Sequence, residues 1–358
     1  MHDLAKVTRI QSIAPIEGKD RIELAKVENY DTVVSKGDFK PGDRCVYIFY
    51  DSILPERPEF EFLRKRCWSE KYKGFRIKPM QLGGVVSEGL VMPMSILPEG
   101  KYKDGQVVTD LLSIRLYEPP EPSVSYMGHR APFREKVRRV LLKHRLTRPI
   151  AKKIPYIPTS YPKGISKSDE ENIEALWEDL QGNHDLWYLT EKMEGQSATY
   201  VFDGKGLKCY SSNKRVWDGS WVQFAEENEL RKHMKHLCRA TGRKGVAIQG
   251  ELCGPGIQKN IYKLDKLKLF VFGMFEADGT RMDPHDMCAY SAFLGLDTVP
   301  FVDEHRQLPS DIGMILAACE GRSLVSDVPR EGVVWRSQTS GKHFKAKSRS
   351  YKVWFDGK

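Results

Sequence analysis

A short proline-rich segment constrains the fold most, because it divides the chain in two. Three prolines lie within the nine residues 118–126, EPPEPSVSY, and the segment has no apolar periodicity. Proline continues neither a helix nor a central strand, so a linker is predicted there. The chain has 358 residues, and a domain typically has roughly 100–200. We predict an N-terminal domain at 1–117, a linker at 118–160 and a second domain at 161–358.

The N-terminal domain contains short runs that are typical of β-strands. Val, Ile and Tyr are frequent in them, and turn signals such as Pro41-Gly42-Asp43 and Gly83-Gly84 separate them. Five or six short strands in about 110 residues favour a small barrel, and we predict an OB-like β-barrel, an architecture that often binds nucleic acids. Periodicity alone does not separate it from other small barrels. The predicted strands are 6–13, 22–27, 32–35, 44–50, 75–82 and 89–94.

The positive charge of the chain is concentrated directly after the prolines. The formal charge is +9, and residues 128–153 hold ten Lys or Arg and one acid, Glu135. Apolar residues at helical spacing predict a helix here. We interpret the segment as a basic strap that contacts phosphates, and the alternative is a solvated linker helix. The candidate nucleic-acid-binding residues are Arg134, Arg138, Arg139, Lys143 and Arg145.

The second domain has the pattern of an α+β fold with mainly antiparallel sheets. Ser168 and Glu171 match a capping box and predict a helix through about Gln181. That helix would bury the stripe formed by Ile173, Leu176, Trp177 and Leu180. Strand-like runs follow from Trp187 to the end and alternate with helical patches near 221–240 and 308–319.

Composition excludes several classes of protein. No segment approaches the ~20 apolar residues of a membrane span, and the first residues lack the apolar core of a signal peptide. The seven cysteines are scattered and form no C-x-x-C pair, which argues against a disulfide framework or a zinc ribbon. We interpret His233, His236 and Cys238 as one face of a solvated helix. We predict a cytoplasmic monomer that does not contact membranes.

An ordered series of motifs in the second domain carries the chemistry. The first is Lys192-Met-Glu-Gly195. A K-x-x-G pattern alone has little weight, because Lys71-Tyr-Lys-Gly74 matches it as well. Only the motif at Lys192 is followed by QGELCGPGIQKN with Glu251, LFVFGMFEADG with Phe272, REGVVWR with Glu331, and HFKAKS with Lys345 and Lys347.

In that order, these motifs resemble the covalent nucleotidyltransferase superfamily of ATP-dependent ligases and capping enzymes. TEKMEGQSATYVF, GELCGPGIQKN, EGVVWR and FKAKS are similar to its RNA ligase branch, whose members carry an N-terminal OB module. AKVTRIQSIAPIEGKDRIELAKV and VVSEGLVMP also resemble that module. The resemblance implies that Lys192 forms a lysyl-AMP phosphoramide, that Glu191 helps to bind adenine and that Phe272 stacks on it. It also implies that Glu251 and Glu331 serve the ribose or the metal.

The residue types suit this chemistry. A lysine has a pKa of about 10.4, so a nucleophilic lysine needs its pKa lowered by roughly three units. We expect Lys345, Lys347 and a bound Mg²⁺ or Mn²⁺ to supply the positive charge and to hold the α-phosphate. Alternation along a strand puts these two lysines on one face. Glu194, Glu251 and Glu331 would hold the metal largely through water.

Simpler interpretations remain open for single residues. Lys192 could be a surface lysine, Phe272 could be core beside Phe270, and the glutamates could be solvated acids. Tyr262, Trp217 and Trp335 are interpreted as core.

The chain departs from the family pattern at two positions. Glu194 stands where Asp is usual, so the charge remains on a side chain that is one methylene longer. Ser212 stands where an arginine is expected to face phosphate or ribose, and Arg215 or Lys214 is the predicted substitute in ATP binding.

These expectations add up to an ATP-dependent RNA ligase that uses Mg²⁺ or Mn²⁺ and joins 3′-hydroxyl to 5′-phosphate ends. The resemblance implies nicks in duplexes with RNA on the 3′-hydroxyl side. One alternative is a DNA nick ligase or capping enzyme, which the eleven residues after Lys347 disfavour because no C-terminal OB domain fits there. The other is a non-catalytic RNA-binding protein with a degenerate transferase domain.

Overall fold

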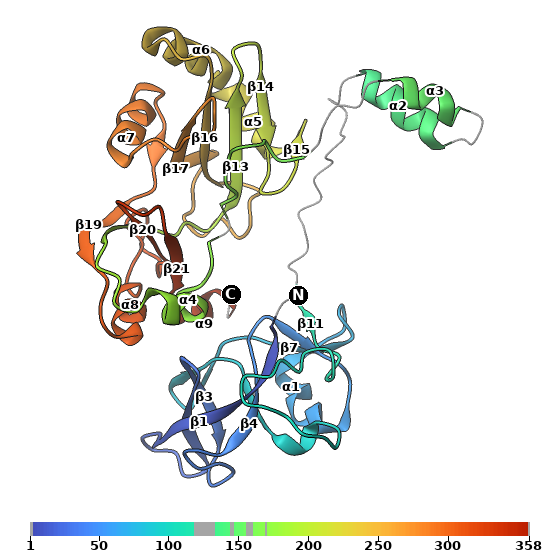
Figure 1. Cartoon of the computed structure of the whole chain (residues 1–358), viewed down its shortest axis with the longest axis vertical. Coiled ribbons are helices and arrows are strands. Elements are labelled where there is room, and N and C mark those ends of the chain that lie inside the picture. The colour runs from blue at the N-terminus through green and yellow to red at the C-terminus, as the bar shows by residue number, and fades with distance from the viewer. Residues whose placement is uncertain (1–2, 118–132, 144–146, 155–159, 169, 357–358) are drawn as a thin grey trace. The chain divides into compact units, whose positions relative to one another are not determined.

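The computed structural model describes residues 3–117, 133–143, 147–154, 160–168 and 170–356 (Figure 1). These residues divide into two compact units. The first unit comprises the residues before the linker together with the C-terminal segment that begins at Ser348. The second unit extends from the basic segment to Lys347. The sequence predicts 161–358 as one domain, whereas the structure assigns its last segment to the N-terminal unit.

The N-terminal unit is built from antiparallel sheets, and most predicted strands are present. The five-stranded sheet has the order β10-β4-β1-β2-β3, the four-stranded sheet β11-β5-β7-β6, and β8 pairs with β9. The predicted strand at 75–82 is two strands, because Pro79 lacks the N–H that would continue the ladder. The elements are β1 (Ala5–Pro15), β2 (Ile22–Val27), β3 (Tyr30–Ser35), β4 (Arg44–Ile48), β5 (Ser52–Leu54), the 3-10 helix η1 (Pro58–Leu63), α1 (Arg64–Cys67), β6 (Trp68–Ser69), β7 (Gly74–Ile77), β8 (Met80–Leu82), β9 (Val85–Ser87), β10 (Leu90–Pro93), the 3-10 helix η2 (Met94–Ile96), β11 (Arg115–Leu116) and α9 (Arg349–Asp356).

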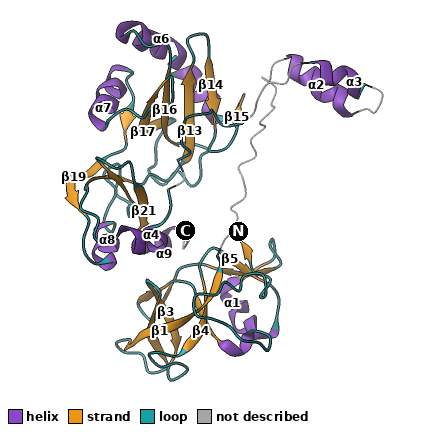
Figure 2. Cartoon of the chain, viewed as in Figure 1, coloured by secondary structure: helices purple, strands orange, loops and turns teal. Residues whose placement is uncertain are grey.

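The second unit contains two larger sheets (Figure 2). The six-stranded sheet has the order β15-β14-β13-β16-β17-β18, and the four-stranded sheet has the order β19-β12-β20-β21. All neighbours are antiparallel except β17 and β18. The elements are α2 (Phe133–Lys143), α3 (Arg148–Lys153), α4 (Ile173–Leu180), β12 (Leu186–Glu191), β13 (Gln196–Phe202), β14 (Leu207–Tyr210), β15 (Arg215–Val216), α5 (Ser220–Glu227), α6 (Leu230–Thr241), β16 (Val246–Cys253), β17 (Lys268–Glu276), α7 (Pro284–Phe293), β18 (Asp297–Thr298), β19 (Phe301–Gln307), α8 (Ile312–Ala318), β20 (Gly332–Ser337) and β21 (His343–Lys347).

Each sheet of the second unit has its own apolar core. Helices α5 and α6 cover the six-stranded sheet, where Phe224 and Met234 pack with Tyr200 and Val271. Helices α4 and α8 cover the four-stranded sheet around Trp335 and neighbouring buried side chains. Strand β12 of one sheet ends at Glu191, and β13 of the other begins at Gln196. The K-x-x-G motif therefore forms the connection between the two sheets.

The predicted capping box is wrong, although the helix that it announced is present. Helix α4 begins at Ile173, and Asn172 is its N-cap residue. The Ser168 hydroxyl instead contacts a strand of the six-stranded sheet, since it lies 2.7 Å from the hydroxyl of Ser197. The predicted apolar stripe does face the core, because Ile173, Trp177 and Leu180 are buried.

Two of the longer helices were not predicted, α7 and α9. A local signal for α7 exists, because Asp283 caps it and Pro284 occupies its first turn. None of the helices in the described ranges combines the length and apolar character that a membrane crossing requires.

Candidate active site

The predicted motifs meet at a cavity of about 390 Å³ in the second unit. Five of the predicted site residues line it: Glu191, Lys192, Glu251, Phe272 and Lys345. They come from both sheets, with Lys192 at the connection between them. Motifs that are far apart along the chain therefore contribute residues to one site.

Lys192 is held by Glu331. Its Nζ donates to Glu331 Oε1 over 2.6 Å, and its backbone N–H donates to the Gly332 carbonyl over 2.9 Å. Burial alone lowers the pKa of Lys192, but the carboxylates of Glu331 and Glu251 outweigh it, so the pKa is raised above its usual value. The sequence predicts that Lys345 and Lys347 lower the pKa of Lys192. The chain's own groups instead raise this pKa, because the two carboxylates outweigh the effect of burial. Added positive charge is needed to free the amine.

Two carboxyl groups near Lys192, those of Glu251 and Glu194, have raised pKa values and are therefore easily protonated. Burial, more than the repulsion from Glu331, raises the pKa of Glu251 to about 8 and that of Glu194 to about 7. Glu194 Oε2 and Glu331 Oε2 are buried without a hydrogen-bond partner. Buried, unpartnered carboxylate oxygens are costly unless a cation compensates them. The donor set therefore fits a hard divalent cation such as Mg²⁺ or Mn²⁺.

The three glutamates do not converge closely enough to hold a metal by direct ligation alone. Across the described residues, the one group of three such ligands within 4.8 Å of one another is Asp283, His285 and Asp286. That group lies at the start of α7, where Asp283 is the helix cap and accepts from the Asp286 N–H. A metal held by these glutamates would therefore need water molecules among its ligands.

Close packing shapes the K-x-x-G connection. A Cβ on Gly195 would lie 2.5 Å from the Leu252 carbonyl oxygen, so only glycine fits there. The backbone N–H of Glu194 donates to the Tyr262 hydroxyl over 2.9 Å. Tyr262 is buried as predicted, but it also orients the loop, a role that no local sequence signal indicated.

Glu191 and Phe272 form another part of the wall. The Leu324 N–H donates to Glu191 Oε2 over 2.8 Å, whereas Glu191 Oε1 is buried without a partner. Burial raises the pKa of Glu191. Phe270 is buried, but Phe272 is only half-buried and lines the cavity. The structure thus brings an unpartnered acceptor and an aromatic face to the same cavity.

Arg336 lines the cavity and was missed in the sequence. Its Nη2 lies 2.6 Å from Glu170 Oε1, and its guanidinium carbon lies 5.8 Å from the centre of the Phe272 ring. Arg336 ends the motif REGVVWR, five residues after Glu331, which would have been the available signal. Lys167, Ser168, Ser197, Ser212 and Asn213 also line the cavity.

The remaining predicted residues lie elsewhere. The guanidinium of Arg215 lies 5.1 Å from the centre of the Trp217 ring, and Arg215 is not among the residues that line the cavity. Ser212, at the position of the expected arginine, does line it. Lys347 shares a strand face with Lys345, because Phe344 and Ala346 on the other face are buried, but it does not line the cavity.

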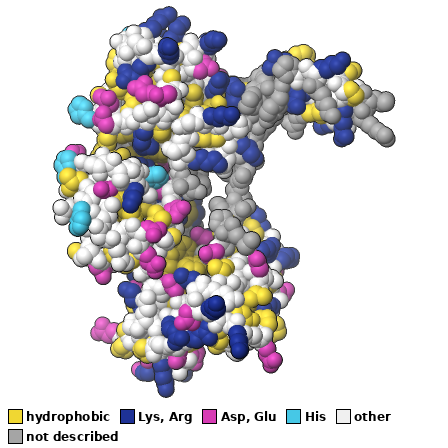
Figure 3. All heavy atoms as spheres, viewed as in Figure 1, with side chains coloured by type: hydrophobic (Ala, Val, Ile, Leu, Met, Phe, Trp, Pro, Cys, Tyr) yellow, Lys and Arg dark blue, Asp and Glu magenta, His cyan; other side chains and the backbone are white. Residues whose placement is uncertain are grey.

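The basic strap forms two helices, α2 and α3, over which Figure 3 shows Lys and Arg side chains. Arg134 and Lys143 are exposed, and Arg138 is half-buried. The side chain of Arg139 and the whole of Arg145 lie outside the described residues.

Comparison with known proteins agrees with this architecture. Residues 185–353 match the RNA ligase family, and residues 4–94 match an OB-fold domain family. No curated protein matches the chain. The chain is similar to the solved structure of Naegleria gruberi RNA ligase with pyrophosphate, with 26% identity, a TM-score of 0.76 and coverage of 100% of both chains. Variants of that ligase with ATP and Mn and with AMP and Mn match at 26% identity, TM-scores of 0.76 and 0.75, and 98% of both chains. The predicted OB module and α+β ligase domain are confirmed.

Proposed function

We propose that this chain, which matches the RNA ligase family over residues 185–353 and an OB-fold domain family over residues 4–94, is an ATP-dependent RNA ligase that seals 3′-hydroxyl and 5′-phosphate ends through a lysyl-AMP intermediate. The proposed substrate is a nick in a duplex with RNA on the 3′-hydroxyl side, as in RNA repair. One observation carries the proposal. Lys192 lies in a cavity shared with Lys345, and its amine is held by a carboxylate, that of Glu331, which a cation can draw away.

In the first step, neutral Lys192 Nζ attacks the α-phosphorus of ATP. A phosphorus–nitrogen bond forms, pyrophosphate leaves with the electron pair of the broken bond, and the amine gives up its proton. Release of Lys192 from Glu331 removes the charge that raises the pKa of the amine, so the ammonium can lose a proton to water and expose its lone pair. Lys345 and Lys347 stabilise the negative charge on the phosphate. The AMP then passes to the 5′-phosphate end, and the 3′-hydroxyl displaces it to form the phosphodiester.

The side chains around the cavity suit the other parts of the nucleotide. Glu191 Oε1 is a buried acceptor for the adenine amino group, and Phe272 offers a flat face for the ring. Glu194, Glu251 and Glu331 are the residues that would hold Mg²⁺ or Mn²⁺, which supplies positive charge to the phosphates and to the site of the nucleophile. Solved complexes of the Naegleria ligase with ATP and Mn support this choice of nucleotide and metal.

The nucleic acid would be bound outside the cavity. We assign this role to the OB module and to the basic segment 128–153, with Arg134, Arg138, Arg139, Lys143 and Arg145. A monomer in the cytoplasm is part of the same proposal.

The test is transfer of label from α-labelled ATP or GTP to the protein with Mg²⁺ or Mn²⁺, after treatment with pyrophosphate to remove bound AMP. We expect label from ATP alone, labile in acid and lost in Lys192→Ala. Lys71→Ala is the matched control, because Lys71 stands in the other K-x-x-G sequence and should keep the label. Nicked duplexes with RNA or DNA at the 3′-hydroxyl then test the substrate. If the wild type stays unlabelled, a non-catalytic RNA-binding role replaces this proposal.

A further inference from the structure

The C-terminal helix belongs to the N-terminal unit, although the strand before it belongs to the active site. Strand β21 carries Lys345 and Lys347 and ends at Lys347. Helix α9 begins at Arg349, and the segment from Ser348 groups with the N-terminal unit. One residue, Ser348, therefore separates a strand of the catalytic site from a helix of the OB unit. In the part of the chain that the structure describes, the one other crossing between the units lies between residue 117 and helix α2.

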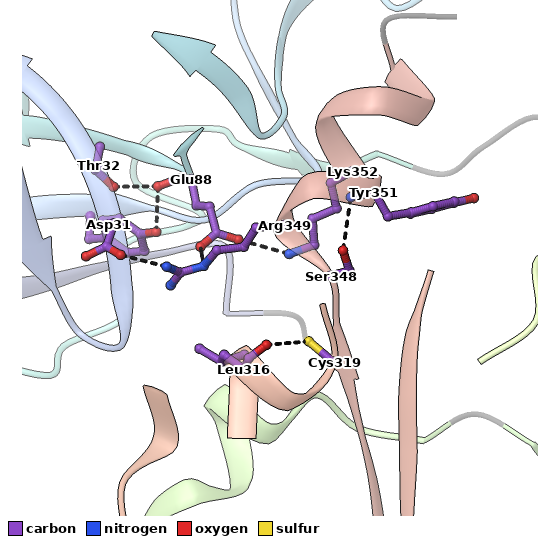
Figure 4. Close-up of polar contacts among 10 residues, drawn as sticks. Asp31, Thr32, Glu88, Leu316, Cys319, Ser348, Arg349, Tyr351 and Lys352 are labelled. Atoms are coloured by element: carbon purple, nitrogen blue, oxygen red, sulfur yellow. Dashed lines mark hydrogen bonds and ion pairs between the residues drawn. The ribbon is translucent and has the colours of Figure 1, made fainter. Parts of the chain in front are cut away.

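Helix α9 forms ion pairs with a buried carboxylate of the N-terminal unit (the OB unit), that of Glu88 (Figure 4). The Glu88 side chain is 1% exposed. Its Oε2 lies 2.9 Å from Arg349 Nε, and its Oε1 lies 3.0 Å from Lys352 Nζ. Arg349 Nη1 also contacts Asp31 Oδ2 at 2.7 Å. Two cations of one helix thus converge on one buried anion.

The receiving site is built to hold Glu88 in place. Its carbonyl oxygen accepts from the Thr32 hydroxyl (Figure 4) and from the Tyr47 hydroxyl, the latter over 2.9 Å. Its N–H donates to the Asp31 carbonyl over 2.8 Å. A Cβ on Gly89, which has φ +73°, would lie 2.5 Å from the Tyr47 hydroxyl oxygen. The backbone at Glu88 is therefore fixed on both sides.

The start of α9 is equally well defined. Ser348 is buried, and its hydroxyl accepts from the Tyr351 N–H over 3.0 Å, which is the contact of a helix N-cap. Removing the cations would leave a buried negative charge without compensation, which strongly disfavours a detached helix. The docked state of α9 is therefore favoured, because its cations compensate the buried charge of Glu88.

We propose that Glu88 and Asp31, with Arg349 and Lys352, form a latch that fastens the OB unit to the end of the strand bearing Lys345 and Lys347. The four are positioning residues for the steps that use nucleic acid, so the inference rests on the proposed function. With the latch closed, nucleic acid bound by the OB unit is held at a high effective concentration for the catalytic site. With it open, the linker at 118–160 is the one remaining tether, and the effective concentration falls.

The test uses the full chain with Glu88→Gln, Lys352→Met and the double variant, and Lys36→Ala as the control at an exposed lysine of the same unit. Hydrogen exchange over 348–356 measures docking. Labelling by ATP measures the first step, and sealing of a nicked duplex below saturation measures the later steps.

We expect Lys352→Met to speed exchange over 348–356, to leave labelling within about twofold and to slow sealing by about tenfold or more, mainly through a higher KM for the duplex. The double variant should be less impaired than Lys352→Met alone, because Glu88→Gln removes the buried charge that Arg349 alone would then have to compensate. Lys352→Arg should restore sealing, and Lys36→Ala should match the wild type.

Three results would overturn the latch. Exchange over 348–356 that is unchanged in Lys352→Met would show that these contacts do not hold the helix. Faster exchange with normal sealing would show that docking has no part in the reaction. Labelling that falls as far as sealing would make α9 a structural support of β21. A wild type that takes no label would instead refute the proposed function, and the exchange experiment would still decide whether the contacts dock α9.

Discussion

At the scale of single residues, Glu331 holds Lys192, the nucleophile that we propose. Its carboxylate pairs with Lys192 and, together with Glu251, raises the pKa of the amine despite burial. The chain without added cations is therefore in a resting state in which the amine is protonated. We expect binding of the metal and of the nucleotide to activate Lys192. Each would change the charge around the carboxylates that set the pKa of its amine.

Metal binding should depend on pH. Burial raises the pKa of Glu251 to about 8 and that of Glu194 to about 7, so both carboxyl groups carry protons at neutral pH for part of the time. A metal binds the deprotonated form, so binding releases protons and strengthens as pH rises from roughly 6 to 9. Calorimetric titration with Mn²⁺ in two buffers of different ionisation enthalpy measures the protons released.

Glu251→Gln is the matched variant for that measurement, and it should reduce both the proton release and the pH dependence. An Mn²⁺ affinity that is constant over the whole range would contradict the prediction.

At the scale of elements, three strands position the groups to which we assign the reaction. Strand β12 leads to Lys192, β20 follows Glu331, and β21 carries Lys345. In this sheet β20 pairs with both β12 and β21, so an error in its register would misplace all three groups. Gly332 pairs with Lys347 of β21, and a Cβ on Gly332 would collide with the Ala346 carbonyl oxygen.

Gly332→Ala should therefore lower stability and labelling together. Overpacking of this kind typically costs about 1–3 kcal/mol, and in a domain of this size each kcal/mol lowers Tm by about 2–4 °C. Thermal unfolding followed by fluorescence measures the loss. Gly206→Ala is the control, because a Cβ at Gly206 meets nothing within 4 Å. Equal Tm values for the two variants would refute the packing argument.

The basic helices lead to a second prediction at this scale. Replacing Arg138, Arg139 and Lys143 with Ala should weaken binding to a nicked duplex. The slope of log K against log salt concentration, where K is the association constant for the duplex, should also become shallower. The slope should change by about one for each phosphate that the protein no longer neutralises. Fluorescence anisotropy at several salt concentrations measures both, and labelling by ATP should not change. If labelling falls to the same extent, the helices have a structural role.

At the scale of the whole molecule, the described part of the chain has separate cores in its two units. Phe75 and Tyr47 belong to clusters within the N-terminal unit, and Tyr200 and Trp335 belong to clusters within the second. The nucleotide site that we propose lies in the second unit alone. Nucleotide binding should therefore stabilise one unit directly.

Calorimetry should accordingly show two unfolding transitions, of which ATP with Mg²⁺ raises one. At a ligand concentration of 100 Kd the expected stabilisation is about 2.7 kcal/mol. GTP at the same concentration is the control and should cause a smaller shift. A single transition that moves as a whole would show that the two units unfold together.

The amino-acid sequence by itself determined many of the elements and, through the resemblance of its motifs to a ligase family, the order of the candidate site residues from Lys192 to Lys347. Local periodicity is enough to find the apolar face of α4, because the residues of that face lie within a few positions of each other. The sequence also indicated most of the longer strands of the N-terminal unit, but it missed the short strands β5, β6, β9 and β11 and the break at Pro79.

Only the tertiary structure decided which distant groups meet. Lys192 and Glu331 are 139 residues apart, and their pairing depends on strand register, which a local pattern does not contain. The same reason explains why Tyr262 beneath the loop, Arg336 in the cavity wall and Arg215 over Trp217 were not foreseen. The docking of α9 on Glu88 is the extreme case, because a charge buried in one unit is compensated by cations from the far end of the chain.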